Sequence, residues 1–178
     1  MSLLRTDIMK GRILMKQASP KARILVVDDS PDICFLLSSH FKLRGFTVNT
    51  ATSGMEAMKY INKDRYEIII CDIIMPGMKG TDLLHKIKKQ YPMTHMIMIT
   101  GYVSLEHILT CMRYGADTCI FKPMDNFSEL DAAVEMALDS LHRWEEKIIA
   151  LKALKEFNTS LEYHDEPDTS TVEVEIIS

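Results

Sequence analysis

Four apolar runs in the 178-residue chain end in, or lead directly into, side chains that can bind ions or transfer groups. These side chains belong to Asp28, Asp29, Asp72, Thr100 and Lys122. Three carboxylates that share one site repel one another unless a cation or a proton compensates. Oxygen ligands with room for water favour Mg²⁺ over zinc or iron. A lysine and a hydroxyl on the opposite rim would then hold an anion, for which phosphate is the natural candidate.

The elements that must position these groups follow from hydrophobic periodicity, because short apolar runs alternate with amphipathic helical patterns. The runs are Arg23–Val27, Thr47–Thr50, Glu67–Cys71, His95–Thr100 and Thr118–Phe121, and helical patterns lie between them near Asp32–Leu43, Met55–Ile61, Thr81–Gln90 and Leu105–Tyr114. The alternation predicts an α/β fold, a doubly wound five-stranded parallel sheet with right-handed crossovers. In the common flavodoxin-like order 2-1-3-4-5 the first and third strands are neighbours, so the three carboxylates converge at one edge.

Local signals support the helix boundaries. Serines that precede helical patterns can cap their N-termini, and glycines just beyond them can end helices in the left-handed conformation. The signals are Ser30 with Pro31 at the first helical position, a capping box from Ser53 to Glu56, Ser104, Gly45 and Gly115.

The last helical pattern is unusually long. It runs from Ser128 to Phe157 without Gly or Pro, roughly 45 Å at about 1.5 Å per residue. Apolar residues follow one another at alternating steps of four and three and form an uninterrupted heptad seam that ends at Lys155. The seam consists of Leu130, Val134, Ala137, Leu141, Trp144, Ile148 and Leu151.

The early seam positions can pack on the domain's own sheet, whereas the later ones need another partner. We expect a homodimer through a parallel helix pair, with Leu141, Trp144, Ile148 and Leu151 as its seam. Packing onto a separate output segment is the second possibility. A helix that folds back as an extra core element is the third.

Composition excludes several classes of protein. With 47% hydrophobic and 26% charged residues, the chain is neither collagen-like, disordered nor a disulfide scaffold. No run approaches 18 apolar residues, so we expect no membrane span.

The formal charge of −4 argues against direct nucleic-acid binding. The four cysteines form no CxxC pair, which suits reduced thiols in a cytoplasmic protein.

We divide the chain into four parts. Residues 1–20 are an N-terminal tail, 21–142 the folded domain, 143–160 a coiled-coil-like extension of the last helix, and 161–178 an acidic tail or truncated linker. The strand-like alternation of 169–178 fits an edge strand, a disordered end, or the start of a following domain, which we favour.

Four segments carry a further signal: ILVVDDSPDI (24–33), IIICDIIMPGMKG (68–80), IMIT (97–100) and IFKP (120–123). Together they resemble the receiver domain of two-component response regulators, over about residues 21–140. The resemblance implies a phosphorylation-activated switch with Mg²⁺ as cofactor and a histidine kinase or phosphotransfer protein as partner. It also implies that the chain is no enzyme beyond its own phosphorylation and slow dephosphorylation.

By motif position, the resemblance assigns roles to individual residues. Asp72 would accept the phosphoryl group. Asp29, Asp72 and the backbone carbonyl of Ile74 would bind the metal directly, with Asp28 as the second acid of the metal site. Lys122, followed by Pro123 in a cis-peptide or loop position, would contact the phosphoryl group. The switch hydroxyl would be that of Thr100, which Gly101 follows.

Three positions depart from the family pattern or add to it. Cys119 stands where the family usually has its switch aromatic, three residues before Lys122. Tyr102 could substitute for that signal or hinder water, or be an ordinary surface aromatic. Ile74 is apolar where relatives often orient water with a polar group, so we expect slow self-dephosphorylation.

Other functions are weaker interpretations. A phosphatase of the haloacid dehalogenase type also forms an aspartyl phosphate, but it needs Asp-x-Asp after the first strand, and Asp28-Asp29-Ser30 lacks this spacing. Neither GxGxxG nor GxxxxGK[ST] is present, which argues against nucleotide binding. Clustered acids would repel the phosphate of a flavin.

Overall fold

The computed structural model describes residues 22–102, 104–123 and 126–162. The expected tail at 1–20 lies outside the described residues, as does nearly all of 161–178. The strands are β1 (Arg23–Val27), β2 (Thr47–Ala51), β3 (Ile68–Asp72), β4 (His95–Thr100) and β5 (Thr118–Phe121), and the helices are α2 (Pro31–Leu43), α3 (Gly54–Lys63), α4 (Gly80–Gln90), α5 (Leu105–Arg113) and α6 (Ser128–Glu162).

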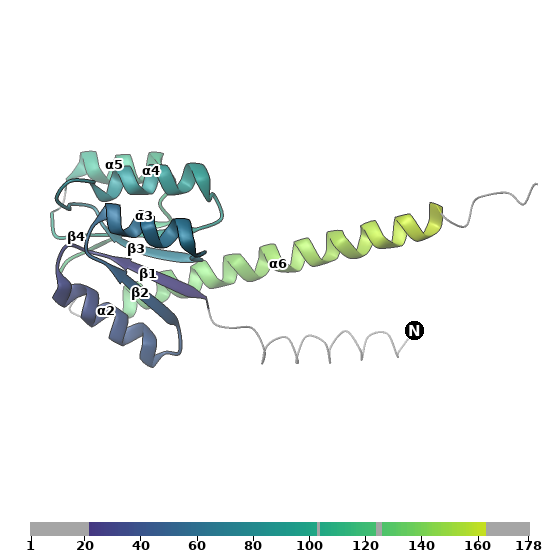
Figure 1. Cartoon of the computed structure of the whole chain (residues 1–178), viewed down its shortest axis with the longest axis horizontal. Coiled ribbons are helices and arrows are strands. Elements are labelled where there is room, and N and C mark those ends of the chain that lie inside the picture. The colour runs from purple at the N-terminus through teal and green to yellow at the C-terminus, as the bar shows by residue number, and fades with distance from the viewer. Residues whose placement is uncertain (1–21, 103, 124–125, 163–178) are drawn as a thin grey trace, which may run out of the picture. The chain divides into compact units, whose positions relative to one another are not determined.

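The five strands form one parallel sheet in the order β2-β1-β3-β4-β5, which confirms the predicted fold. Figure 1 shows α2 and the first turns of α6 on one face, and α3, α4 and α5 on the other. Alternate residues of each strand face opposite sides. Ile24 and Ile70 therefore join the core under α2 and α6, whereas Leu25 and Ile69 join the core under α3, α4 and α5.

Two predicted N-caps form. Ser30 accepts a hydrogen bond from the backbone N–H of Ile33, with Pro31 at the start of α2. Ser53 accepts one from the N–H of Glu56 at 3.2 Å. The second hydrogen bond of the predicted capping box differs from the prediction. The Glu56 carboxylate accepts from the backbone N–H and the hydroxyl of Thr52 instead of from the backbone N–H of Ser53.

The third predicted cap is wrong in detail, while both glycine signals are confirmed. Ser104 precedes α5 in an extended conformation, but its side chain makes no cap hydrogen bond. Gly45 and Gly115 adopt φ of 85° and 81°, each two residues after the last residue of α2 or α5. A side chain there would strain the backbone, which is why glycine ends these helices.

Helix α6 is continuous from Ser128 to Glu162, five residues longer than predicted. Its early seam residues Leu130, Val134 and Ala137 are buried in the core. The chain divides into two compact units between Asp139 and Ser140, so α6 begins in the first and ends in the second. None of the described helices combines the length and apolarity that crossing a membrane requires.

Candidate functional site

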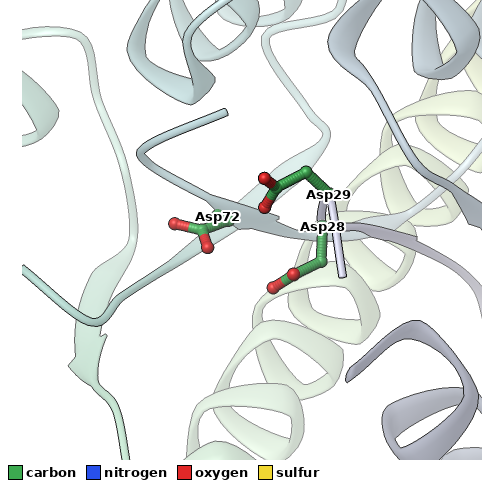
Figure 2. Close-up of side chains that lie close together, drawn as sticks. All are labelled: Asp28, Asp29 and Asp72. Atoms are coloured by element: carbon green, nitrogen blue, oxygen red, sulfur yellow. The ribbon is translucent and has the colours of Figure 1, made fainter. Parts of the chain in front are cut away.

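Three acids lie together where β1 and β3 end. Val27 pairs with Cys71 in the sheet, so Asp28 and Asp72 leave neighbouring strands at the same level. Carboxylate oxygens of Asp28, Asp29 and Asp72 lie within 4.8 Å of one another. Figure 2 shows these three side chains gathered at the ends of the two strands. Asp28 and Asp72 are buried, whereas Asp29 is exposed and leaves one side of the cluster open to water.

Lys122 bridges the two buried acids. Its Nζ lies 2.7 Å from Asp28 Oδ2 and 2.6 Å from Asp72 Oδ2, across the sheet from β5. The bond between Lys122 and Pro123 is cis, one of the two arrangements, a cis peptide or a loop, that the resemblance implied for this position. A buried carboxylate that loses its cationic partner is strongly destabilising, so this ammonium is what allows the two acids to share the site.

Burial and charge act against each other on these groups. Burial raises the pKa of the Asp28 carboxyl above its ordinary value, and hydrogen bonds from Lys122 and the Ser30 backbone N–H offset only part of the rise. Burial alone would lower the pKa of the Lys122 ammonium, but its hydrogen bonds to Asp28 and Asp72 outweigh burial and raise it. The lysine is therefore charged at neutral pH.

Backbone N–H groups hold the remaining acid oxygens. Asp28 Oδ1 accepts from the N–H of Ser30, and Asp72 Oδ1 accepts from the N–H of Ile74, each at 3.0 Å. The Ile74 side chain is 45% exposed and brings no polar group to the site. Asp72 therefore presents its carboxylate in a fixed orientation, with Lys122 on one oxygen and a backbone donor on the other.

The donor set fits a magnesium ion. Three carboxylates against one ammonium leave two negative charges, which a divalent cation matches. All candidate ligands are oxygens, and the exposed side at Asp29 admits the waters that Mg²⁺ retains. The residues therefore suit the metal that the sequence led us to expect.

Thr100 reaches the same edge of the sheet, but its hydroxyl faces its own loop. Thr100 Oγ1 donates to the carbonyl of Tyr102 at 3.0 Å and accepts from the N–H of Tyr102 at 3.1 Å. Thr100 is buried, while the Tyr102 side chain is 63% exposed. Gly101 lies beside Lys122, and a Cβ there would be in ordinary contact with the lysine side chain, 3.9 Å from its nearest atoms.

Cys119 occupies its position on β5 as a half-buried thiol packed against the core under α3, α4 and α5. Burial raises the pKa of this thiol, so it is neutral at physiological pH. The site thus has no aromatic ring at this position that could rotate. The second unit, which begins at Ser140, contains the predicted seam residues Leu141, Trp144, Ile148 and Leu151.

Sequence reasoning missed Gly80. A Cβ at this first residue of α4 would lie 1.9 Å from the backbone oxygen of Asp72. The N–H of Gly80 also donates to the carbonyl of Ile73 at 2.9 Å, which ties α4 to the segment that carries the acid. The run Pro-Gly-Met-Lys-Gly after the acid was the available signal, because paired glycines in a short loop indicate a tight backbone approach.

A groove beside Lys122 was also missed. Its volume is about 510 Å³, and it lies between the start of α2 and the segment that follows β5. The lining residues are Ile33, Leu36, Gly101, Lys122, Pro123 and Phe127. The lining is mostly apolar and no motif marks it, since its residues come from three separate segments.

Comparisons with known proteins agree on one family. A family model described as the response regulator receiver domain matches residues 24–135. The transcriptional regulatory protein ZraR of Escherichia coli is 33% identical over 119 residues, which cover 67% of this chain and 27% of ZraR. A homologue of the transcriptional regulatory protein CpxR from Haemophilus influenzae is 32% identical over 66% of this chain and 50% of its own length. The chain thus spans about a quarter to a half of the curated relatives it matches.

Solved structures give the same result. A CheY-like receiver domain protein from Methanospirillum hungatei matches with a TM-score of 0.66 and 34% identity, over 68% of this chain and 97% of that one. The response regulator TrrA of Thermotoga maritima, solved with Mg²⁺ and a beryllium fluoride, matches with a TM-score of 0.60 and 34% identity, over 65% and 98%. These matches give no support to the haloacid dehalogenase alternative. The chain belongs to the receiver domain family of response regulators, which are phosphorylation-activated switches.

Proposed function

We propose that Asp72 is the phosphoacceptor of this switch. The observation that supports it is the placement of a buried carboxylate 2.6 Å from the Lys122 ammonium and beside two further acids. A carboxylate oxygen of Asp72 attacks phosphorus, the bond from phosphorus to a histidine nitrogen of the donor breaks, and an acyl phosphate forms. The donor histidine leaves with the electron pair of the broken bond.

Asp29, Asp72 and the carbonyl of Ile74 would hold Mg²⁺ directly, with Asp28 beside them as the second acid. When bound, the ion neutralises part of the charge on the phosphoryl oxygens. Lys122 screens the repulsion between the attacking carboxylate and the incoming phosphoryl group, since its ammonium already lies on Asp72. Once the phosphoryl group is in place, the Thr100 hydroxyl turns from Tyr102 toward one of its oxygens.

A histidine kinase or phosphotransfer protein would approach over the groove beside Lys122. The groove lies next to the acceptor's own ammonium partner, and Leu36 on its wall is partly exposed. An apolar side chain of the donor protein could occupy it while the phosphohistidine meets Asp72. The free state of all four cysteines suits a reducing cytoplasm, where we place this reaction.

A calorimetric titration with Mg²⁺ and beryllium fluoride, which mimics a phosphoryl group on a carboxylate, tests the site. We expect saturable binding that needs both components in the native chain and loss of beryllium fluoride binding in Asp72→Asn. Asp117→Asn, which removes a carboxylate outside the site, serves as control and should bind normally. Binding that survives Asp72→Asn would contradict the assignment.

We further propose that the later part of α6 forms a homodimer. Trp144, Ile148 and Leu151 are 48%, 47% and 66% exposed, which is unusual for a periodic apolar stripe. Ile148 at an a position and Leu151 at a d position favour a parallel two-stranded coiled coil. Such a dimer would carry the state of Asp72 to whatever output the longer relatives have beyond this region.

A further inference from the structure

His107 on α5 has a buried ring nitrogen that no other described residue hydrogen-bonds. Its Nδ1 makes no hydrogen bond with any of the described residues, although it is shielded from solvent. A buried polar group without a hydrogen-bond partner destabilises the folded state, so it calls for an explanation. The ring of Tyr102 meets the imidazole edge to face, with centroids 6.3 Å apart.

The backbone of Tyr102 is also hydrogen-bonded to the hydroxyl of Thr100, the predicted switch residue. One atom, Thr100 Oγ1, bonds both the N–H and the carbonyl of the Tyr102 backbone. Any movement of that hydroxyl toward Asp72 must give up its donation to the Tyr102 carbonyl, because a hydroxyl has one hydrogen. The backbone position of Tyr102 therefore depends on where Thr100 points.

We propose that Tyr102 and His107 relay the state of Asp72 to α5, an inference that rests on the proposed function. When Thr100 donates to a phosphoryl oxygen, the Tyr102 carbonyl is released and the Tyr102 side chain turns toward α5. The phenol O–H of Tyr102 then donates to His107 Nδ1, which accepts when the ring hydrogen is on Nε2. Tyr102 and His107 are positioning residues, and the orphaned nitrogen is the partner that the phosphorylated state satisfies.

Two further observations favour this route. Cys119 is a packed thiol, so β5 provides no rotating ring at that position. Helix α5 carries a stripe of exposed apolar residues, Leu105, Leu109 and Met112, at steps of four and three. A new hydrogen bond at His107 would shift or stiffen the helix that presents this stripe.

Nitrogen-15 NMR of the histidine rings in the full chain tests the relay. In the native protein, Mg²⁺ with beryllium fluoride should move the His107 Nδ1 resonance in the direction of a hydrogen-bonded acceptor. Tyr102→Phe should still bind Mg²⁺ and beryllium fluoride but lose this shift. Tyr114→Phe is the matched control, since Tyr114 contacts a different histidine, His85, with ring centroids 4.5 Å apart. It should keep the His107 shift in full.

The outcomes separate the two proposals. If the native chain binds beryllium fluoride but His107 Nδ1 stays unchanged, or if Tyr102→Phe retains the shift, the relay is wrong while the proposed function stands. If the native chain binds no beryllium fluoride, both are overturned.

Discussion

At the scale of single residues, Lys122 is the side chain on which the acidic site most depends. Without it, Asp28 and Asp72 would be two buried carboxylates with no cation between them. We expect Lys122→Met to lower the free energy of unfolding by about 3 kcal/mol in the absence of Mg²⁺. Added Mg²⁺ should restore part of the loss, because it supplies the missing positive charge.

Urea unfolding with and without Mg²⁺ measures this effect. Lys88→Met is the control, since Lys88 pairs with the partly exposed Asp117 at 3.3 Å and such pairs contribute at most about 1 kcal/mol. If Lys122→Met and the native chain were equally stable in the absence of Mg²⁺, the Lys122 ammonium would not be what stabilises the two buried acids.

Asp28 and Asp117 should respond to pH with opposite signs. Burial raises the pKa of Asp28, so the folded state favours the protonated carboxyl group and ionisation of this group opposes folding. The stability contributed by the protonated form is lost as the pH rises through the folded-state pKa. Burial also acts to raise the pKa of Asp117, but the hydrogen bonds from His95 and the Met96 N–H outweigh it and lower the pKa. Ionised Asp117 therefore stabilises the fold above its unfolded pKa, and the contribution disappears as pH falls through the lower folded value.

Unfolding curves of two variants between pH 2 and 7 test these signs. We expect Asp28→Asn to be more stable than the native chain at pH 7, with a gap that closes toward acid. Asp117→Asn should be less stable at pH 7, by about 1 kcal/mol, and this gap should also shrink as the pH falls. Equal pH profiles for the two variants would rule out this account of the charges.

Ile74 sets the lifetime of the acyl phosphate in this account. It offers no polar group that could orient water near Asp72, and its backbone N–H is already committed to Asp72 Oδ1. We expect slow loss of the phosphoryl group, and a rate on the order of tenfold higher in Ile74→Asn. Following phosphoprotein decay by mass spectrometry checks both rates, and native decay as fast as in the variant would contradict the role of Ile74.

At the scale of elements, Gly80 decides how closely α4 approaches β3. A Cβ at Gly80 would lie 1.9 Å from the backbone carbonyl oxygen of Asp72, which forces either α4 or the end of β3 to move. Gly80→Ala should destabilise the fold by at least about 1–3 kcal/mol and weaken beryllium fluoride binding. Gly101→Ala is the stability control, because the nearest atoms to its Cβ would be 3.9 Å away. Thermal unfolding of both variants compares them, and equal melting temperatures would contradict the clash.

Periodicity was sufficient to predict the strands. The common flavodoxin-like strand order then brought Asp28, Asp29, Asp72 and Lys122 together, because parallel strands end at one edge of the sheet. It could not show where the Thr100 hydroxyl points, since that depends on a bond within its own loop. Ser104 looked like a cap by residue type, but the rotamer and loop geometry that decide such a bond are not local in sequence. Contacts between separate elements, such as that of Gly80 with Asp72 or of Tyr102 with His107, can be predicted only once the three-dimensional fold is known.

At the scale of the whole molecule, the seam on α6 is the surface through which we propose that two copies of the chain associate. We expect sedimentation to show a dimer that Ile148→Asp with Leu151→Asp converts to a monomer at all concentrations. Ile149→Asp is the matched control, because Ile149 is equally exposed but lies off the heptad seam. A dimer that persists in the double variant, or is lost in Ile149→Asp alone, would contradict a seam-based interface.

The function proposed for this chain requires Asp72 to form an acyl phosphate with the help of Mg²⁺. The most direct measurement is the intact mass of the chain after incubation with a small-molecule phosphodonor, with and without Mg²⁺, beside Asp72→Asn. We expect a gain of one phosphoryl group that requires Mg²⁺ and is absent in the variant. No gain in the native chain, or a gain that survives Asp72→Asn, would contradict it.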